Sequence, residues 1–141
     1  MHTEVVRGIT IRPLRNGDSA VIQQVFDRLG PASRLLRFGG AKNVLSPADL
    51  ELLARVDGDH HVLVAWAGGE PIGIGRLVRE GCSGEVAFAV ADEWQSQGVG
   101  RVLADRLAAD ARAAGITCFR ADVRRDNVRS AGLLRRLQTA S

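Results

Sequence analysis

The feature of the sequence that limits the possible folds of this chain most is a strand that leads through a glycine turn directly into a helix. The strand pattern covers Glu85–Val90, and a helical pattern begins at Val99. Between them the turn contains Gln95 and Gly98, and Gly100 follows within the first helical turn. Glycine lets the backbone approach a ligand closely, and the first N–H groups of a helix have no acceptor within the helix. Together with the helix dipole, this arrangement predicts an anion site suited to phosphate.

Three kinds of phosphate-binding turn can be compared with this stretch. A P-loop needs Gly-Lys followed by Ser or Thr, which the chain lacks here. A dinucleotide-binding turn follows the first strand of a parallel sheet and has an acidic residue about 20 positions later, and neither condition holds. The third kind, the pyrophosphate turn Gln/Arg-x-x-Gly-x-Gly/Ala, fits Gln95, Gly98 and Gly100.

The rest of the chain alternates between strand and helix patterns and predicts one domain over residues 1–141. The expected strands are Gly8–Leu14, His61–Ala67, Pro71–Arg79, Glu85–Val90 and Ile116–Val123. The expected helices run from N-cap Asp18 to Leu29, from N-cap Ser46 with Pro47 to about Asp57, from Val99 to Ala114, and over Asp126–Leu137. The order is βααβββαβα. We therefore expect an α/β or α+β fold with a mixed sheet and helices on its faces, the last two strands being parallel.

Composition excludes several classes of protein. The 141 residues suit a single domain, and with 45% apolar residues the chain can bury a core. No apolar run reaches the roughly 18 residues that a membrane-spanning helix needs, so a cytoplasmic protein is expected. Cys82 and Cys118 are too few for a disulfide framework or a zinc site, and each is expected to be a small buried side chain. The three histidines lack partners at metal-ligand spacing, so no metal is expected.

Positive charge is concentrated at the end of the chain. Residues 120–141 contain six arginines and two aspartates, although the whole chain has a net charge of +3. Such a basic end suits a phosphate-bearing ligand or an acidic partner, and a solvated helix face explains it equally well. A nucleic-acid module is disfavoured because no aromatic residues are interleaved with the arginines.

In this context the chain resembles the GNAT superfamily of acetyl-CoA-dependent N-acyltransferases. Ile11–Asp18 is similar to the family's opening strand and turn, Glu85–Val90 to its fourth strand, and Asn127 to the asparagine after its fifth strand. Further residues resemble the bacterial protein lysine acetyltransferase group: Ser33–Phe38, Leu45, Ser46, Ala65, Gly73 and Arg76. In that group the domain is often fused to a nucleotide-sensing or acyl-CoA-synthetase-like module, for which 141 residues leave no room.

The resemblance implies transfer of an acetyl group from acetyl-CoA to an amine, either a protein lysine or a small molecule. It assigns pyrophosphate binding to the amides around Gly98, Val99, Gly100 and Arg101, with Gln95 shaping the turn. It also implies that pantetheine pairs with the backbone near Phe88, Ala89 and Val90, where one N–H stabilises the oxyanion, and that Asn127 contacts pantetheine. Core packing for Phe88 and Val90, and helix capping for Asn127, are the structural alternatives.

Glu85 is the carboxylate best placed to accept the proton of the amine. A lysine amine has a pKa of about 10.4 and arrives charged at neutral pH. Glu85 opens an apolar strand, and burial among Val86, Ala87 and Val78 would make it a stronger base. The alternatives are a solvated glutamate at a turn, or an ion pair with Arg76 or Arg79 that would weaken it as a base.

Two departures from the family pattern leave other functions open. The position of the family's frequent tyrosine is Leu134 here, and the chain has no tyrosine. The thiolate must then take its proton from solvent or from the amine, or the chain is a non-catalytic acyl-CoA-binding domain. The family's final hairpin also has no counterpart after Leu137, so strand Ile116–Val123 should have an open edge beside Ile116, Cys118 and Phe119. We expect that edge to pair in a homodimer or with another polypeptide, unless the chain is a truncated form.

Overall fold

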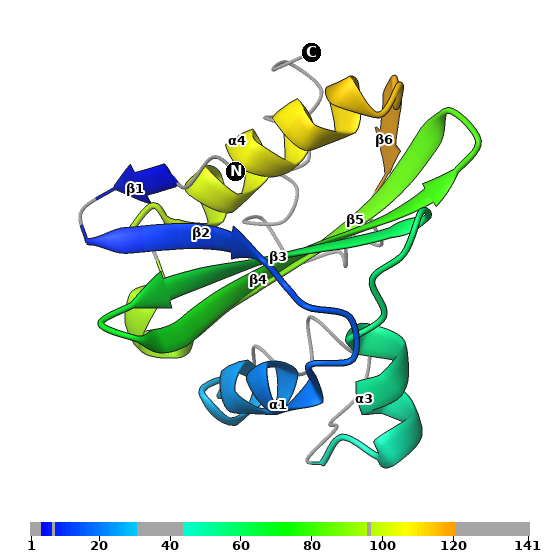
Figure 1. Ribbon diagram of the computed structural model, residues 1–141. Coiled ribbons are helices and arrows are strands. Elements are labelled where there is room, and N and C mark those ends of the chain that lie inside the picture. Colours follow the sequence, from blue (N-terminus) through cyan, green and yellow to red (C-terminus); the bar gives the residue numbers. More distant parts are fainter. Residues whose placement is uncertain (1–3, 7, 31–43, 96, 121–141) are drawn as a thin grey trace.

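A mixed sheet of six strands forms the centre of the computed structural model, which describes residues 4–6, 8–30, 44–95 and 97–120 (Figure 1). The strands are β1 (Glu4–Val6), β2 (Ile9–Pro13), β3 (His60–Ala67), β4 (Glu70–Glu80), β5 (Ser83–Val90) and β6 (Cys118–Arg120). The helices are α1 (Ser19–Asp27), α3 (Pro47–Leu53) and α4 (Val99–Ala113), with a 3-10 turn, η1 (Asp92–Trp94), before α4. None of the helices in these described ranges has the length and apolarity to cross a membrane.

The strands lie in the sheet in the order in which they occur along the chain. Neighbours from β1 to β5 are antiparallel, whereas β5 and β6 are parallel and are joined through α4. This arrangement confirms the expected mixed sheet. The strand β1 was not predicted, because three residues are too few to show an alternating pattern; it pairs with β2 across Gly8, whose φ is +78°. The remainder of the predicted strand Ile116–Val123 and the predicted helix Asp126–Leu137 lie outside the described residues.

Each face of the sheet packs against its own helices. Helix α4 covers one face, while α1 and α3 lie on the other (Figure 1). On the α4 face, Leu103 and Leu107 are fully buried against the sheet residues Ile11 and Leu63. On the α1 face, Phe26 packs in a second buried cluster that includes side chains of α1 and β3. The alternating strand pattern divides the side chains of β3, β4 and β5 between these two cores.

Helix α3 begins where the sequence predicts and ends earlier. Ser46 is its N-cap: its side chain accepts a hydrogen bond from the N–H of Asp49, and the Asp49 carboxylate accepts one from the N–H of Ser46. The predicted extension to about Asp57 is wrong, because the helix ends at Leu53. The Asp57 carboxylate instead accepts hydrogen bonds at 2.9 Å from the N–H groups of Asp59 and His60 and turns the chain into β3.

The expected burial of the cysteines is also wrong. Cys82 and Cys118 are both exposed free thiols. They lie at the end of the sheet where β5 and β6 begin to pair, at Ser83 and Cys118. Burial of a free cysteine depends on its place in the sheet, which composition does not specify.

Candidate active site

Gln95 ties the glycine turn to the end of β5. Its side-chain amide donates to the carbonyl oxygen of Val90 at 3.0 Å and to Oδ1 of Asp92 at 3.3 Å. Gln97 donates to the carbonyl oxygen of Glu93 at 2.9 Å. These side-chain bonds hold the chain in a tight path around η1 and bring it to the start of α4.

The N-terminal end of α4 is left open by its own residues. Its N-cap is Gly98, with a φ of +89°, and no side chain caps the helix. The first bond of the helix joins the N–H of Val102 to the carbonyl of Gly98 at 3.1 Å, so the N–H groups of Val99, Gly100 and Arg101 precede the intrahelical ladder. Its first turn has no acidic residue, and a Cβ added at Gly98 would meet nothing within 4 Å. This end of the helix can therefore accept an anion at close range.

Part of the edge of β5 faces away from β4 next to this turn. Along an antiparallel strand the backbone groups of alternate residues face opposite neighbours. The N–H of Ala91 donates to Ile72 of β4, which places the N–H groups of Phe88 and Val90 on the side of β6. In the part of the chain that the structure describes, β6 pairs only with Ser83–Glu85. The N–H groups of Phe88 and Val90 therefore point away from β4 beyond that pairing, where an extended ligand could accept hydrogen bonds from them.

The side chains of β5 divide between the two faces of the sheet. Phe88 packs with the α4 core, as does Val90. Ala89 packs with the α1 core, and it pairs with Ile74 of β4, whose side chain shares that face. Since alternate residues point the same way, Glu85 lies on the α1 face as well.

The expectation that Glu85 is buried is wrong. Its side chain is 52% exposed, because it lies near the start of β5, next to the short strand β6. Its closest charged partner is Arg120, with Nε 3.7 Å from Oε2, and not Arg79, whose Nε donates to the carbonyl of Gly81. Arg76 pairs in register with Ala87, two residues from Glu85 on the same face, and is attracted by its carboxylate.

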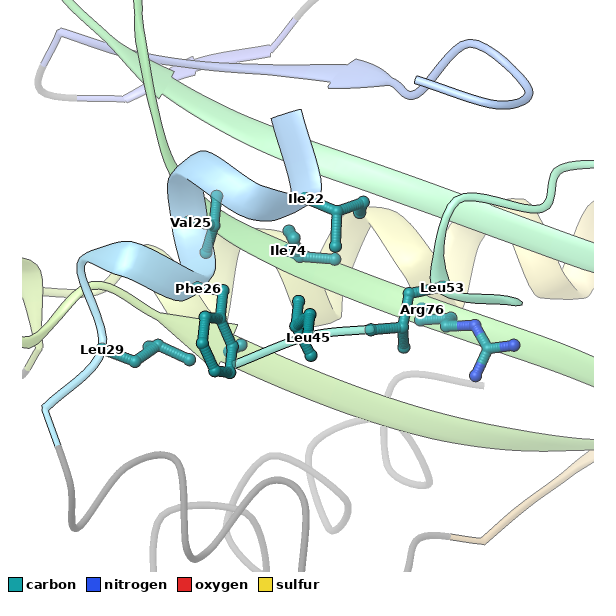
Figure 2. Close-up of a pocket in the computed structure, with 9 residues that line it drawn as sticks. Ile22, Val25, Phe26, Leu29, Leu45, Leu53, Ile74 and Arg76 are labelled. Carbon is teal, nitrogen blue, oxygen red and sulfur yellow. The ribbon is translucent and has the colours of Figure 1, made fainter. Parts of the chain in front are cut away.

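Arg76 forms one end of an apolar pocket on the α1 face, and Leu29 lies at the other end (Figure 2). The pocket is lined by Ile22, Val25, Phe26, Leu29, Leu45, Leu53, Ile74, Arg76 and Ala89. Burial lowers the pKa of Arg76, and the attraction of Glu85 opposes that shift. Its Nε is buried and has no hydrogen-bond partner, while Nη2 lies 3.4 Å from the carbonyl of Leu52.

Sequence reasoning named Arg76 as a possible partner of Glu85 and did not find the pocket. The alternation of β4, with Ile74 and Arg76 two residues apart, was the available signal that both share a face. Asn127 and Leu134 lie outside the described residues. Within the described ranges, no group of three or more His, Cys, Asp or Glu side chains could hold a metal ion.

Comparison with known proteins identifies the family. Residues 28–138 match the model of the Acetyltransferase (GNAT) family. The chain belongs to this family. It is 35% identical over 116 residues to "Acetyltransferase PA5475" of Pseudomonas aeruginosa, covering 77% of this chain and 62% of the relative. It is 39% identical over 94 residues to "Acetyltransferase Pat" of Mycolicibacterium smegmatis, covering 62% of this chain and 28% of the relative.

This GNAT chain therefore spans 28% to 62% of the length of these two relatives. Among solved structures it is similar to the GNAT domain of S. lividans PAT. The two share 28% sequence identity and superpose with a TM-score of 0.86, over 96% of this chain and 85% of that one. The α+β fold expected from the sequence is that of a GNAT domain.

Proposed function

We propose that this GNAT chain is an acetyl-CoA-dependent N-acetyltransferase of the cytoplasm whose acceptor is a lysine of a protein. The observation that carries the proposal is that the N-terminus of α4, whose N-cap is Gly98, follows the end of β5 at which the N–H groups of Phe88 and Val90 face away from β4. The first suits a pyrophosphate and the second an extended pantetheine arm. The resemblance of residues such as Arg76 to the lysine acetyltransferase group supports the choice of acceptor.

The coenzyme is held mainly by backbone groups in this proposal. The N–H groups of Val99, Gly100 and Arg101 bind the pyrophosphate, since they have no intrahelical acceptor and lie at the positive end of the helix dipole. The arm pairs with the backbone of Phe88–Val90, and Asn127 contacts it. Acetyl-CoA supplies the acetyl group as an activated thioester. A backbone N–H of β5 is then the donor that stabilises the oxyanion at the carbonyl carbon.

Glu85 accepts the proton of the acceptor amine, directly or through water. Its half-exposed carboxylate can pass that proton on to solvent. The nearby guanidinium groups of Arg76 and Arg120 disfavour a positively charged amine and so favour the neutral, nucleophilic form. The nitrogen forms a bond to the acetyl carbon, the bond from that carbon to sulfur breaks, and the thiolate takes a proton from solvent.

A second candidate is a non-catalytic acyl-CoA-binding domain. It is favoured by one specific observation, the absence of tyrosine from a chain whose relatives often use one near the leaving thiolate. It requires the same coenzyme site and makes no use of Glu85. The two functions therefore predict the same binding and different turnover.

The test combines binding and turnover. Acetyl-CoA binding is measured by calorimetry, and thiol release is measured with lysine-containing peptides and proteins and with a panel of small amines. We expect binding, and turnover with lysine acceptors above the rate of hydrolysis alone. If turnover occurs only with small amines, the acceptor is a small molecule and not a protein lysine. Binding without turnover would favour the non-catalytic domain. Absence of acetyl-CoA binding would reject both functions.

A further inference from the structure

The carboxylate of Asp92 connects two segments that are far apart in the sequence. Its Oδ2 accepts a hydrogen bond at 2.9 Å from the N–H of Gly30, just beyond the C-terminal end of α1. Its Oδ1 accepts one at 3.3 Å from the side chain of Gln95, in the turn that leads to α4. The N–H of Asp92 also donates to the carbonyl of Arg28 at 3.1 Å. Through one residue, the end of α1 is bonded to the coenzyme turn.

The Asp92 carboxylate occupies the space that a side chain at position 30 would need, so only glycine leaves room for it. The backbone of Gly30 lies outside the left-handed region, so its conformation alone does not demand glycine. A Cβ added at Gly30 would overlap Oδ2 of Asp92 and lie 3.3 Å from its Cγ. Any larger residue at this position must therefore displace the Asp92 side chain or move the end of α1.

Ion pairs of Arg28 with exposed glutamates also lie at this end of α1. Arg28 binds Glu93 at 2.8 Å and Glu70 at 2.5 Å, and both glutamate side chains are 65% exposed. Exposed pairs of this kind contribute little to a fixed geometry because solvent screens them. The side-chain bonds of Asp92 to the N–H of Gly30 and to Gln95 therefore add to its backbone bond with Arg28 in fixing the spacing of the two segments.

We propose that Asp92 is a positioning residue that holds the coenzyme turn in register with α1, and this inference rests on the proposed function. Gln95, the residue that Asp92 engages, fixes the start of the turn against Val90. Displacing the carboxylate removes one of the bonds of Gln95, which loosens the turn and shifts the N–H groups of α4 relative to the pyrophosphate. Helix α1 also supplies Val25 and Phe26 to the pocket of Figure 2, so the bonds of Asp92 link the helix that lines this pocket to the coenzyme turn.

A double-mutant cycle on the whole chain tests this coupling. The variants are Gly30→Ala, Asp92→Ala and the double variant, and the readout is the Kd for acetyl-CoA measured by calorimetry. Each single substitution is expected to raise Kd about 3- to 15-fold, the effect of losing one or two hydrogen bonds. Because Gly30→Ala acts through the carboxylate, adding it to Asp92→Ala should raise Kd no further.

Matched variants separate positioning from folding. A Cβ at Gly58 meets nothing within 4 Å, so Gly58→Ala should leave Kd within about twofold of the parent chain. Glu93→Gln breaks an ion pair of Arg28 and keeps both bonds of the Asp92 carboxylate, so it should also leave Kd within about twofold. Asp92→Asn retains an acceptor for the N–H of Gly30 but presents an NH2 donor to Nε2 of Gln95, so it should restore only part of the affinity lost in Asp92→Ala.

The outcomes are distinct. Parent-like affinity in both Gly30→Ala and Asp92→Ala, or effects that simply add in the double variant, would overturn the inference and leave the proposed function intact. A loss of affinity in Gly58→Ala equal to that in Gly30→Ala would also overturn it. Absence of acetyl-CoA binding by the parent chain would reject the proposed function, and this inference with it.

Discussion

The charged guanidinium group of Arg76 lies at one end of an apolar pocket, where its neighbours determine how well the charge is stabilised. Its Nε is buried with no hydrogen-bond partner, and burial lowers its pKa. A guanidinium nevertheless stays protonated at physiological pH, because its ordinary pKa lies far above neutrality. Glu85, on the same face of the sheet, supplies the compensating negative charge. The pair forms a local electrostatic unit beside the proposed reaction centre.

Replacing Glu85 tests its proposed role directly. Glu85→Gln keeps the size of the side chain and removes its capacity to accept a proton, so kcat should fall by about 10²- to 10⁴-fold. The Kd for acetyl-CoA should stay the same, because the coenzyme is held by backbone groups elsewhere. Steady-state kinetics and calorimetry on the same preparation provide both values.

Glu80→Gln is the matched control for that substitution. Glu80 binds the same arginine, Arg120, at 2.6 Å, but it lies at the turn end of β4. Its replacement should leave kcat within about twofold of the parent value. An unchanged kcat in Glu85→Gln would assign Glu85 to the protein surface and leave the base to be found elsewhere.

Two helix ends show that a suitable residue at the N-cap position does not always form a capping hydrogen bond. Ser46 and Asp18 both stand at the N-cap of a helix, and both were expected to cap. Ser46 accepts a bond from the N–H of Asp49, whereas the side chain of Asp18 makes no capping bond to α1. The φ and ψ of Asp18, −76° and 70°, differ from the extended conformation of Ser46, which places a side-chain oxygen over the first turn.

This contrast predicts unequal costs for two similar substitutions. Ser46→Ala should lower the free energy of unfolding by about 0.5–2 kcal/mol, the usual effect of losing an N-cap. Asp18→Ala should change it by less than about 0.5 kcal/mol, as expected for a surface site without such a bond. Urea unfolding followed by circular dichroism measures both. Equal losses would show that the capping bond of Ser46 is not what stabilises α3.

The start of α4 is the other helix end with a measurable consequence. Gly100→Val adds a branched side chain beside the proposed pyrophosphate site and should raise the Kd for acetyl-CoA by at least about tenfold, equivalent to roughly 1.4 kcal/mol. Ala109→Val makes a comparable change at an exposed position of the same helix and should leave Kd unaltered. If calorimetry finds equal affinity in the two folded variants, the coenzyme does not bind at this end of α4.

In the whole molecule, both faces of the sheet carry a closed core, and some apolar side chains lie outside these cores. Leu103 of α4 is fully buried against the sheet, whereas Leu52 of α3 is 52% exposed. Leu103→Ala should lower the free energy of unfolding by about 2–5 kcal/mol, because it leaves a cavity in a closed core. Leu52→Ala should cost about 1 kcal/mol or less. Urea unfolding of the two variants gives the comparison, and similar losses would contradict the placement of Leu103 in a closed core.

Local patterns predicted most of this fold because they repeat over several residues. The alternation of β5 and the helical stripe of α4, with Leu103 and Leu107, required no knowledge of the tertiary structure. Position in the sheet was harder to predict. Cys118 and Glu85 lie at the end of the sheet where β5 and β6 pair, and both are exposed although their neighbours in sequence are apolar. Three-residue β1 was too short to show a pattern.

The sequence predicted the glycine turn of the candidate site better than it predicted the contacts of the charged side chains. The turn from Gln95 to Gly100 is contiguous in sequence, so a motif describes it. The link between Asp92 and Gly30 joins residues 62 positions apart, and the pocket combines side chains from Ile22 to Ala89. Only the packed sheet brings these residues together. Edge pairing of the last strand stays a prediction.

The division of β5 between its two faces also bears on how such a protein can diverge. A coenzyme recognised through main-chain N–H and carbonyl groups is indifferent to which side chains the strand carries. Substitutions at Ala87 and Ala89 then reshape the acceptor side, while Phe88 and Val90 continue to anchor the opposite core. Related proteins can thus change their acceptor specificity and keep the same acetyl donor.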